Sequence, residues 1–328
     1  MRFKQFLQES RTRKAVTEAD AANWIAKNAP KYWDALMHES TQPIYRGESG
    51  FDNDFILTNS GAGRKSLTGP NFVTQLVDSS DEWKDYPKRS ESFICSTSLG
   101  YAGKFGPSIY LMIPTDTAMI AIAPKDDFWY SFSDLESLKD RSNYNFGIEP
   151  LNYAMLNLLL LHKNINDGGK VIHRTVLNGD IEFASASALK TALDDTQKFL
   201  ETYYRLSDFG PAYKFDTIGE LISEAERLEW DNADIEKLEF LRDDLLSNNL
   251  SRAMALLFAA RGEKLSKFVE SLLNPTNNSI ELVKASDGFD HRVNKEVWFS
   301  GDALMIYRSG NDDNYQQLLD SINEELNK

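Results

Sequence analysis

The sequence predicts an α+β protein in which a strand-rich core is interrupted by a block of helices. Short apolar segments bounded by turn residues predict strands at about 92–98, 108–113 and 118–123. Three more such segments, SIELV, EVWFS and ALMIYR, follow near the C-terminus. Between the two groups, residues 188–273 carry apolar side chains at helical spacing. With 328 residues, 41% of them hydrophobic, the chain can form one large domain or two smaller ones.

The chain before these strands is expected to hold two helices and a further strand. Residues 17–38 predict the helices, because Thr17 is a candidate N-cap with Asp20 three residues on, close to a capping box. A proline separates the two helices. The segment PIYRG at 43–47 predicts a short strand, and the stretch 48–90 is expected to be rich in loops.

Helix signals dominate the middle of the chain. A buried helix is predicted at about 150–163, opened by Pro150 and containing the longest apolar run, Leu156 to Leu161. Farther on, TIGE is a capping box, Asn232 is a candidate cap and Gly262 is a natural helix stop. The segment NPTNN then ends the helical block, and a polar helix is expected to close the chain after the last strands.

Composition excludes several classes of function. The formal net charge is −14, so the chain is repelled by nucleic acid and by anionic membranes, and a nucleic-acid partner is unlikely. No apolar run approaches the roughly 20 residues that span a bilayer. Cys95 is the single cysteine, which excludes intramolecular disulfides and favours a reducing compartment.

Three short stretches contain the residues best suited to catalysis or ligand binding, in the order arginine, hydroxyl cluster, glutamate. Arg46 lies in IYRGES, Ser96 lies with two more hydroxyl residues in FICSTSL, and Glu296 begins the strand of EVWFSGDALMIYR. Taken singly, each has a structural explanation. Arginine and glutamate at strand ends form surface ion pairs, and hydroxyls bond to local backbone. Their combination at three predicted strands is what favours a site.

The combination resembles the mono-ADP-ribosyltransferases, a family that includes bacterial toxins and enzymes that tailed phages inject into host cells. The resemblance is carried by YRG, then F-x-STS-x-x-x-A-x-x-FG-x-x-I-x-x-x-IP, then EVWFSG-x-x-x-x-IYR. It covers about 43–124 and 280–308. It implies a split β-sandwich core, with a cleft between two small sheets. In this chain the domain would run over 11–328, with N-terminal helices and a helical insertion at about 188–273.

The resemblance also implies the substrate and the reaction. The family uses NAD as a substrate, breaks the bond between nicotinamide and ribose, and transfers ADP-ribose to a target, here expected to be a host protein. Arg46, with its neighbour Gly47, would bind the pyrophosphate, because a guanidinium binds phosphate oxygens bidentately. Glu296 would stabilise the positive charge that develops on the sugar.

The hydroxyl cluster has roles in the same expectation. Ser96 would position the glutamate and the nicotinamide–ribose end of NAD. Thr97 and Ser98 would hold the strand end open beside the cleft. An aromatic ring on the loop that follows, from Tyr101 or Phe105, would stack on nicotinamide, although packing in the core explains Phe105 equally well.

One position departs from the family pattern. Members that modify arginine carry Glu-x-Glu and those that modify asparagine carry Gln-x-Glu, whereas here Asn294 takes the first position. An asparagine side chain cannot act as a base. The acceptor would then not be arginine, or the enzyme would mainly hydrolyse NAD, or catalysis would be lost. Glu182, in DIEF, is a rival for the glutamate, and the flanking residues favour Glu296.

The N-terminus adds a second resemblance. MRFKQFLQES is similar to the leaders of internal head proteins of large tailed phages, in which a protease cuts at Leu/Ile-x-Glu, here Leu7-Gln8-Glu9. Residues 1–10 would then be a cleavable leader, and the protein would lie inside the virion and later in the host cytoplasm. The alternative is the first turn of an amphipathic helix, with Phe3, Phe6 and Leu7 on one face.

Two other functions stay open. The chain can be a packaged head protein that keeps the transferase fold without catalysis, or an NAD-using enzyme that modifies nucleic acid or a small molecule. No metal is expected, because the four histidines lack ligand spacing. Cys95 lies inside an apolar strand, where a thiol is usually inert.

Overall fold

A computed structural model describes residues 12–50, 53–61, 71–133, 135, 147–166, 183–205, 208, 218–244, 248–290, 294–308 and 312–328. The chain forms two compact units. The strand unit comprises Met1–Leu67, Asp81–Ser131 and Asn278–Lys328, and the helical unit comprises Thr68–Ser80 and Phe132–Asn277. The predicted α+β class is confirmed.

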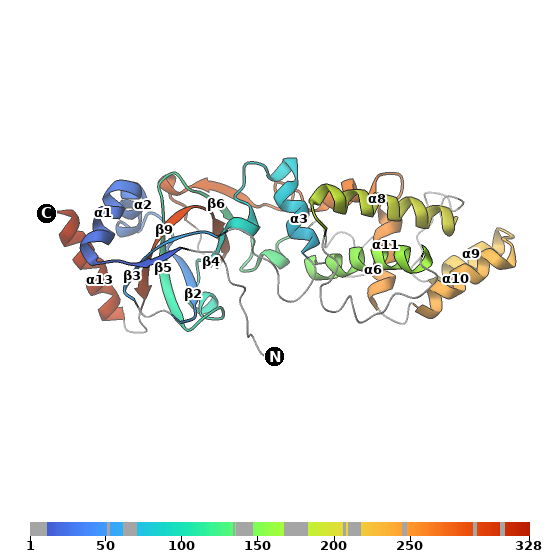
Figure 1. The fold of residues 1–328 in the computed structure, drawn as a ribbon, viewed down its shortest axis with the longest axis horizontal. Helices are drawn as coiled ribbons and strands as arrows, with labels where there is room; N and C mark the ends of the chain where they lie inside the picture. The colour runs from blue at the N-terminus through green and yellow to red at the C-terminus, as the bar shows by residue number, and fades with distance from the viewer. Residues whose placement is uncertain are drawn as a thin grey trace. The chain divides into compact units, whose positions relative to one another are not determined.

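Among the described residues, the strand unit is built on one nine-stranded sheet in which every neighbouring pair is antiparallel. Figure 1 shows the sheet with helices at one end of the unit. The strands, in their order across the sheet, are β1 (Arg13–Ala15), β3 (Phe55–Asn59), β9 (Asp302–Arg308), β5 (Ser108–Pro114), β2 (Ile44–Glu48), β4 (Phe93–Ser96), β8 (Glu296–Phe299), β6 (Met119–Ile122) and β7 (Glu281–Lys284).

The sheet has a narrow join in its middle. β2 and β4 share a single residue pair, Tyr45 with Ser96. On either side, β2 pairs with β5 over the whole of Ile44–Glu48, and β4 pairs with β8 over the whole of Phe93–Ser96. The structure therefore has one continuous sheet where the resemblance implied two small ones, and the pairing between β2 and β4 joins its two halves. We call this join the seam.

Three helices pack beside the strands of this unit: α1 (Glu18–Asn28), α2 (Pro30–Met37) and α13 (Asp312–Leu326). The capping box predicted for α1 is present, since the Thr17 side chain and the Asp20 side chain each bond to the other residue's backbone N–H. Trp33 Nε1 donates to Asn323 Oδ1 at 2.9 Å, which ties α2 to α13. The predicted closing helix is thus part of the core.

Short helical turns connect the remaining parts of the strand unit. They are η1 (Asp81–Trp83), η2 (Arg89–Glu91), α4 (Leu99–Ala102), η3 (Phe128–Tyr130) and η5 (Ala285–Asp287). Two of them, η2 and η3, follow irregular segments that the sequence did not assign to any element. Both contact the candidate site described below.

The helical unit is larger than the insertion expected at 188–273. It contains α3 (Phe72–Ser79), α6 (Ile148–Asn166), α8 (Ala186–Tyr203), α9 (Ile218–Arg227), α10 (Asn232–Asp244), α11 (Asn248–Ala259) and α12 (Leu265–Leu272). Figure 1 shows α6 lying beside both α8 and α11. The Gln197 side chain joins α8 to the start of α12, since its Nε2 donates to Glu263 O at 2.8 Å and its Oε1 accepts from Leu265 N at 2.6 Å.

Several expectations need correction or lie outside the described residues. The stretch 48–90, expected to be rich in loops, also contains β3 and α3. The cap of α10 is Asp231, whose Oδ1 accepts from Asp234 N at 2.9 Å, and Asn232 is the first residue of that helix. The leader at 1–10, the capping threonine of TIGE and Glu182 lie outside the described residues. None of the described helices is long and apolar enough to cross a membrane.

Candidate functional site

The fold brings the three predicted motifs to neighbouring strands. Arg46 lies on β2, Ser96 ends β4 and Glu296 begins β8, and these strands are adjacent in the order β2-β4-β8. Ser96 and Glu296 are directly paired across β4 and β8, although they lie far apart in the sequence. Directly opposite residues in an antiparallel pair project their side chains from the same face. Ser96 and Glu296 therefore share one face where β4 ends and β8 begins, and the candidate site is built on this pair. Ser96 also pairs with Tyr45, so alternation puts the next residue of β2, Arg46, on the other face of that strand.

The Glu296 side chain is buried and both of its oxygens are bound. The residue is 4% exposed. Its Oε1 accepts from Arg89 Nη1 at 2.7 Å, and its Oε2 accepts from the backbone N–H of Phe128 at 3.1 Å. A carboxylate can be buried in ionised form only with such partners. Arg89, on η2, was not predicted as a site residue.

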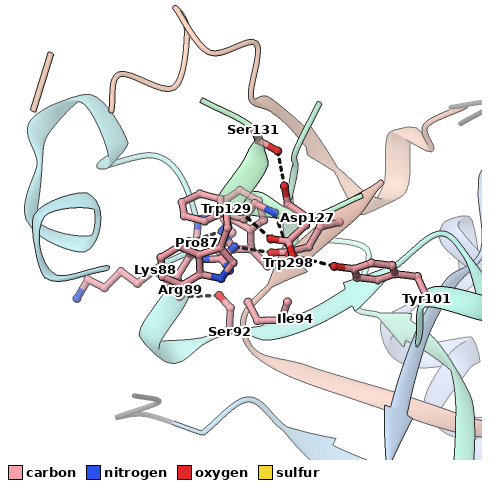
Figure 2. Close-up of polar contacts among 12 residues, drawn as sticks. Pro87, Lys88, Arg89, Ser92, Ile94, Tyr101, Asp127, Trp129, Ser131 and Trp298 are labelled. Atoms are coloured by element: carbon pink, nitrogen blue, oxygen red, sulfur yellow. Dashed lines mark hydrogen bonds and ion pairs between the residues drawn. The ribbon is translucent and has the colours of Figure 1, made fainter. Parts of the chain in front are cut away.

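Arg89 is enclosed by aromatic rings. Its guanidinium carbon lies 3.7 Å from the centre of the Phe128 ring and 4.9 Å from that of Trp298. Both distances are within the range of a cation–π contact. Figure 2 shows Arg89 grouped with Trp298 and Pro87, and Trp298 Nε1 donates to Pro87 O at 2.9 Å. The segment that bears Arg89 is thereby bonded to β8.

Arg46 is also buried and paired. It is 8% exposed, and its Nε donates to Glu48 on the same strand. Its Nη1 donates to Ile94 O at 2.5 Å, across the seam. Glu48 Oε2 accepts in addition from Arg13 Nη2 at 2.9 Å. The arginine expected to bind pyrophosphate thus has a carboxylate partner in this structure, one that alternation along β2 places on the same face.

The three hydroxyl side chains fix the end of β4. Ser96 Oγ donates to Lys295 O at 3.4 Å and accepts from Ser98 N at 3.0 Å. Thr97 Oγ1 accepts from Lys295 N at 2.9 Å. Ser98 caps α4, because its Oγ accepts from Tyr101 N at 3.3 Å. The hydroxyls therefore hold the residue before Glu296 and start the helical turn that leaves the strand.

Two glycines let the segment after β4 lie against β2. A Cβ on Gly47 would lie 2.1 Å from Ala102 O, and a Cβ on Gly106 would lie 2.3 Å from Glu48 O. Both distances are far below van der Waals contact, so only glycine fits at either position. Gly47, which the resemblance assigns to NAD binding, has this packing role in the structure.

The aromatic residues after the hydroxyl cluster have different surroundings. Phe105 is 37% exposed and its ring lies 5.5 Å from that of Tyr101, edge to face. Tyr101 OH donates to Asp127 Oδ2 at 2.9 Å, as Figure 2 shows. Burial and this hydrogen bond raise the pKa of the Tyr101 hydroxyl above its ordinary value. The exposed fraction of Phe105 shows that this side chain is not part of the core.

The remaining predicted positions add little. Asn294 is exposed, two residues before Glu296. Cys95 is buried in β4. Among the residues that the structure describes, no group of three or more histidine, cysteine, aspartate or glutamate side chains could hold a metal ion.

Comparison with family models, with curated proteins and with solved structures finds no match to this chain.

Proposed function

We propose that this protein is an NAD-dependent mono-ADP-ribosyltransferase of a tailed phage that modifies a host protein. The motif resemblance is the basis of the proposal. The observation that supports it best is the direct pairing of Ser96 with Glu296, next to the strand of Arg46. Three motifs that lie far apart in the sequence are thereby on neighbouring strands.

The proposed chemistry uses NAD as a substrate. The bond between nicotinamide and the ribose carbon breaks, nicotinamide leaves with the bonding electrons, and the sugar becomes cationic. A nucleophile of the target then bonds to that carbon and loses its proton. Glu296 is buried, and a carboxylate in a low-dielectric environment stabilises a nearby cation more strongly than one in water.

NAD also fits the charges at the seam. A guanidinium suits a pyrophosphate, and Arg46 would bind it by exchanging its bond to Glu48 for bonds to phosphate oxygens. Asn294 is exposed two residues before Glu296 but cannot take a proton. The acceptor on the target is therefore proposed to be a side chain other than arginine, one that needs no carboxylate at this position.

The test is incubation of the purified chain with labelled NAD and bacterial lysate. Label is expected on a discrete protein band, absent with Glu296→Gln and retained with the control Glu281→Gln, which changes the exposed first residue of β7. Arg46→Met is expected to weaken NAD binding about 10- to 100-fold, since a hydrogen bond to a charged group contributes roughly 1.5–3 kcal/mol. Labelling that persists in Glu296→Gln would contradict the assignment of that residue.

A second candidate is an internal head protein that keeps this fold without catalysis. The specific observation in its favour is that both charged candidates are already engaged, Arg46 with Glu48 and Glu296 with Arg89. The departure at Asn294 agrees with it. A chain that neither binds NAD in a titration nor releases nicotinamide would favour this candidate over the transferase.

The proposed location follows from the leader resemblance alone. A protein packaged in the virion interior and delivered with the genome would act in the host cytoplasm. Detection in purified virions of a chain from which the leader has been removed would support this location.

A further inference from the structure

Arg89 and Glu296 form a buried ion pair that no sequence motif predicts. The Arg89 side chain is 8% exposed and the Glu296 side chain 5%. A pair removed from water loses much of its hydration, and its attraction compensates only when the geometry is good and the other polar atoms are bonded. The distance of 2.7 Å between Nη1 and Oε1 meets the first condition.

The cation is held from two sides, so its position is defined before any ligand binds. The centres of the Phe128 and Trp298 rings lie 3.7 and 4.9 Å from the guanidinium carbon of Arg89. Its own segment is bonded in place, because Ser92 Oγ donates to Lys88 O at 2.6 Å and Trp298 Nε1 donates to Pro87 O. Figure 2 shows Pro87, Ser92 and Trp298 around Arg89.

The second oxygen of Glu296 is held by backbone, and that backbone is itself fixed. Phe128 N donates to Oε2 at 3.1 Å. The preceding residue, Asp127, accepts from Trp129 N at 2.7 Å and from Tyr101 OH at 2.9 Å, and its carbonyl accepts from Ser131 Oγ at 2.8 Å. The donor therefore belongs to a rigid turn and not to a loose loop.

One donor on each oxygen defines the plane and the direction of the carboxylate. Each oxygen keeps a further lone pair with which to accept a hydrogen bond. We infer that Arg89 is a positioning residue for Glu296. It holds the carboxylate in a fixed orientation, while the substrate's sugar uses the remaining lone pairs. The inference rests on the proposed function, since it concerns the same carboxylate.

The test measures nicotinamide release by Arg89→Met, Arg89→Lys and the control Lys88→Met, whose side chain is exposed and pairs on the surface with Glu91. Misplacement of a catalytic group by about 1 Å costs roughly 100-fold in rate. Arg89→Met is therefore expected to lower kcat about 100-fold while the KM for NAD changes less than about threefold. Arg89→Lys, which keeps the charge, should recover at least about tenfold of that loss.

A second measurement separates positioning from folding. Arg89→Met leaves a buried carboxylate without its cation, whereas the double variant Arg89→Met, Glu296→Gln removes both charges. The single variant is expected to lower Tm more than the double variant does. If Arg89→Met does not fold, Arg89→Lys carries the test, with a reduced kcat and an unchanged KM as the expected result.

Three outcomes would overturn the inference while leaving the proposed function intact. The first is an unchanged kcat in Arg89→Met, or in Arg89→Lys where only that variant folds, with an active parent and an inactive Glu296→Gln. The second is a variant faster than the parent, which would mean that Arg89 competes with the substrate for the carboxylate. The third is a loss of activity that only follows the folded fraction. A parent that releases no nicotinamide would overturn the proposed function itself, and the inference with it.

Discussion

The charged side chains of the candidate site are buried in pairs. Arg46 bonds to Glu48, which also binds Arg13, and Arg89 bonds to Glu296. Removing one member of a buried pair typically costs 3–5 kcal/mol, about as much as a large cavity in the core. Replacing both members with apolar residues of similar volume is often neutral or stabilising. Stability alone therefore does not explain two such pairs, one within β2 and one between η2 and β8, which is what a site for a charged substrate would need.

Residue by residue, the sequence indicated one member of each pair. Arg46 and Glu296 were predicted because each belongs to a recognisable motif at a strand. The alternation along IYRGE puts Glu48 on the same face as Arg46, and this signal could have identified the partner. Arg89 gave no such signal. It lies 207 residues from Glu296, on a short turn, and only the tertiary fold brings them together.

A glycine substitution tests the close approach of the segment after β4 to β2. Gly106→Ala places a Cβ 2.3 Å from Glu48 O, a backbone atom that cannot move without disturbing the sheet. We expect a loss of about 1–3 kcal/mol in unfolding free energy, as for overpacked cores. The matched control is Gly100→Ala, within α4, where the nearest atom to the new Cβ would be 3.9 Å away.

The control should be neutral or stabilising by up to about 1 kcal/mol, because alanine is favoured over glycine in a helix. Urea unfolding curves of the two variants and the parent measure the difference. Equal stability of Gly106→Ala and the parent would mean that β2 and the segment after β4 are farther apart than in this structure.

Among the secondary-structure elements, those with strong local signals were predicted and those without were missed. The capped helix α1, the apolar strands β4, β5 and β8, and the long helices of the helical unit follow from periodicity and capping residues. β1 has only three residues, Arg13–Ala15, and no apolar alternation, so its pairing with β3 determines it. β3 and α3 lie among glycines and polar residues that suggested loops.

The α1 capping box predicts the effect of a single substitution at an element end. Thr17→Ala removes the hydroxyl that accepts from Asp20 N at 3.2 Å, and the helix should lose about 1 kcal/mol. Thr17→Ser keeps the acceptor and should be close to neutral, because serine caps a helix at least as well as threonine. Thermal unfolding of both variants checks the expectation. A serine variant as unstable as the alanine variant would show that packing of the threonine methyl group, and not the cap, carries the effect.

Considered as a whole, the molecule consists of two units, each with its own buried apolar residues. The sequence predicted a helical insertion but placed its start too late. The helical unit takes in α3 and α6, and α3 is separated from the rest of that unit in the sequence by β4, β5 and β6. No local pattern can reveal that an eight-residue helix belongs with helices far along the chain, because membership depends on which surfaces pack together.

Alkaline pH is expected to destabilise the strand unit through its buried tyrosines. The Tyr32 side chain is fully buried in α2, and burial, followed by nearby Cys95, Tyr45 and Tyr315, raises the pKa of its hydroxyl far above the ordinary value. In the unfolded chain that pKa is about 10. Because the folded pKa is raised, the contribution to stability is complete below pH 10 and is lost as the pH rises further.

Tyr32→Phe removes this dependence. Between pH 10 and 12 the variant should lose about 1.4 kcal/mol less per pH unit than the parent, because the unfolded parent releases a proton that the folded parent keeps. Tyr130→Phe, which changes a tyrosine that is 67% exposed, is the control. Urea unfolding at pH 9, 10, 11 and 12 measures the slopes, and parallel slopes for parent and Tyr32→Phe would contradict the prediction.

The pairing of β6 with β7 bears on how this chain can change in length. The chain leaves the sheet after Ile122 and returns at Glu281, and these two residues are direct partners. Roughly 160 residues of sequence lie between Ile122 and Glu281, although the two are neighbours in the sheet. Closing an unstructured loop of that length costs only about 3 kcal/mol more than closing a four-residue turn, because the entropy of closure grows with the logarithm of length. Whole helices can therefore be gained or lost at this sheet edge, while the order of the strands stays the same.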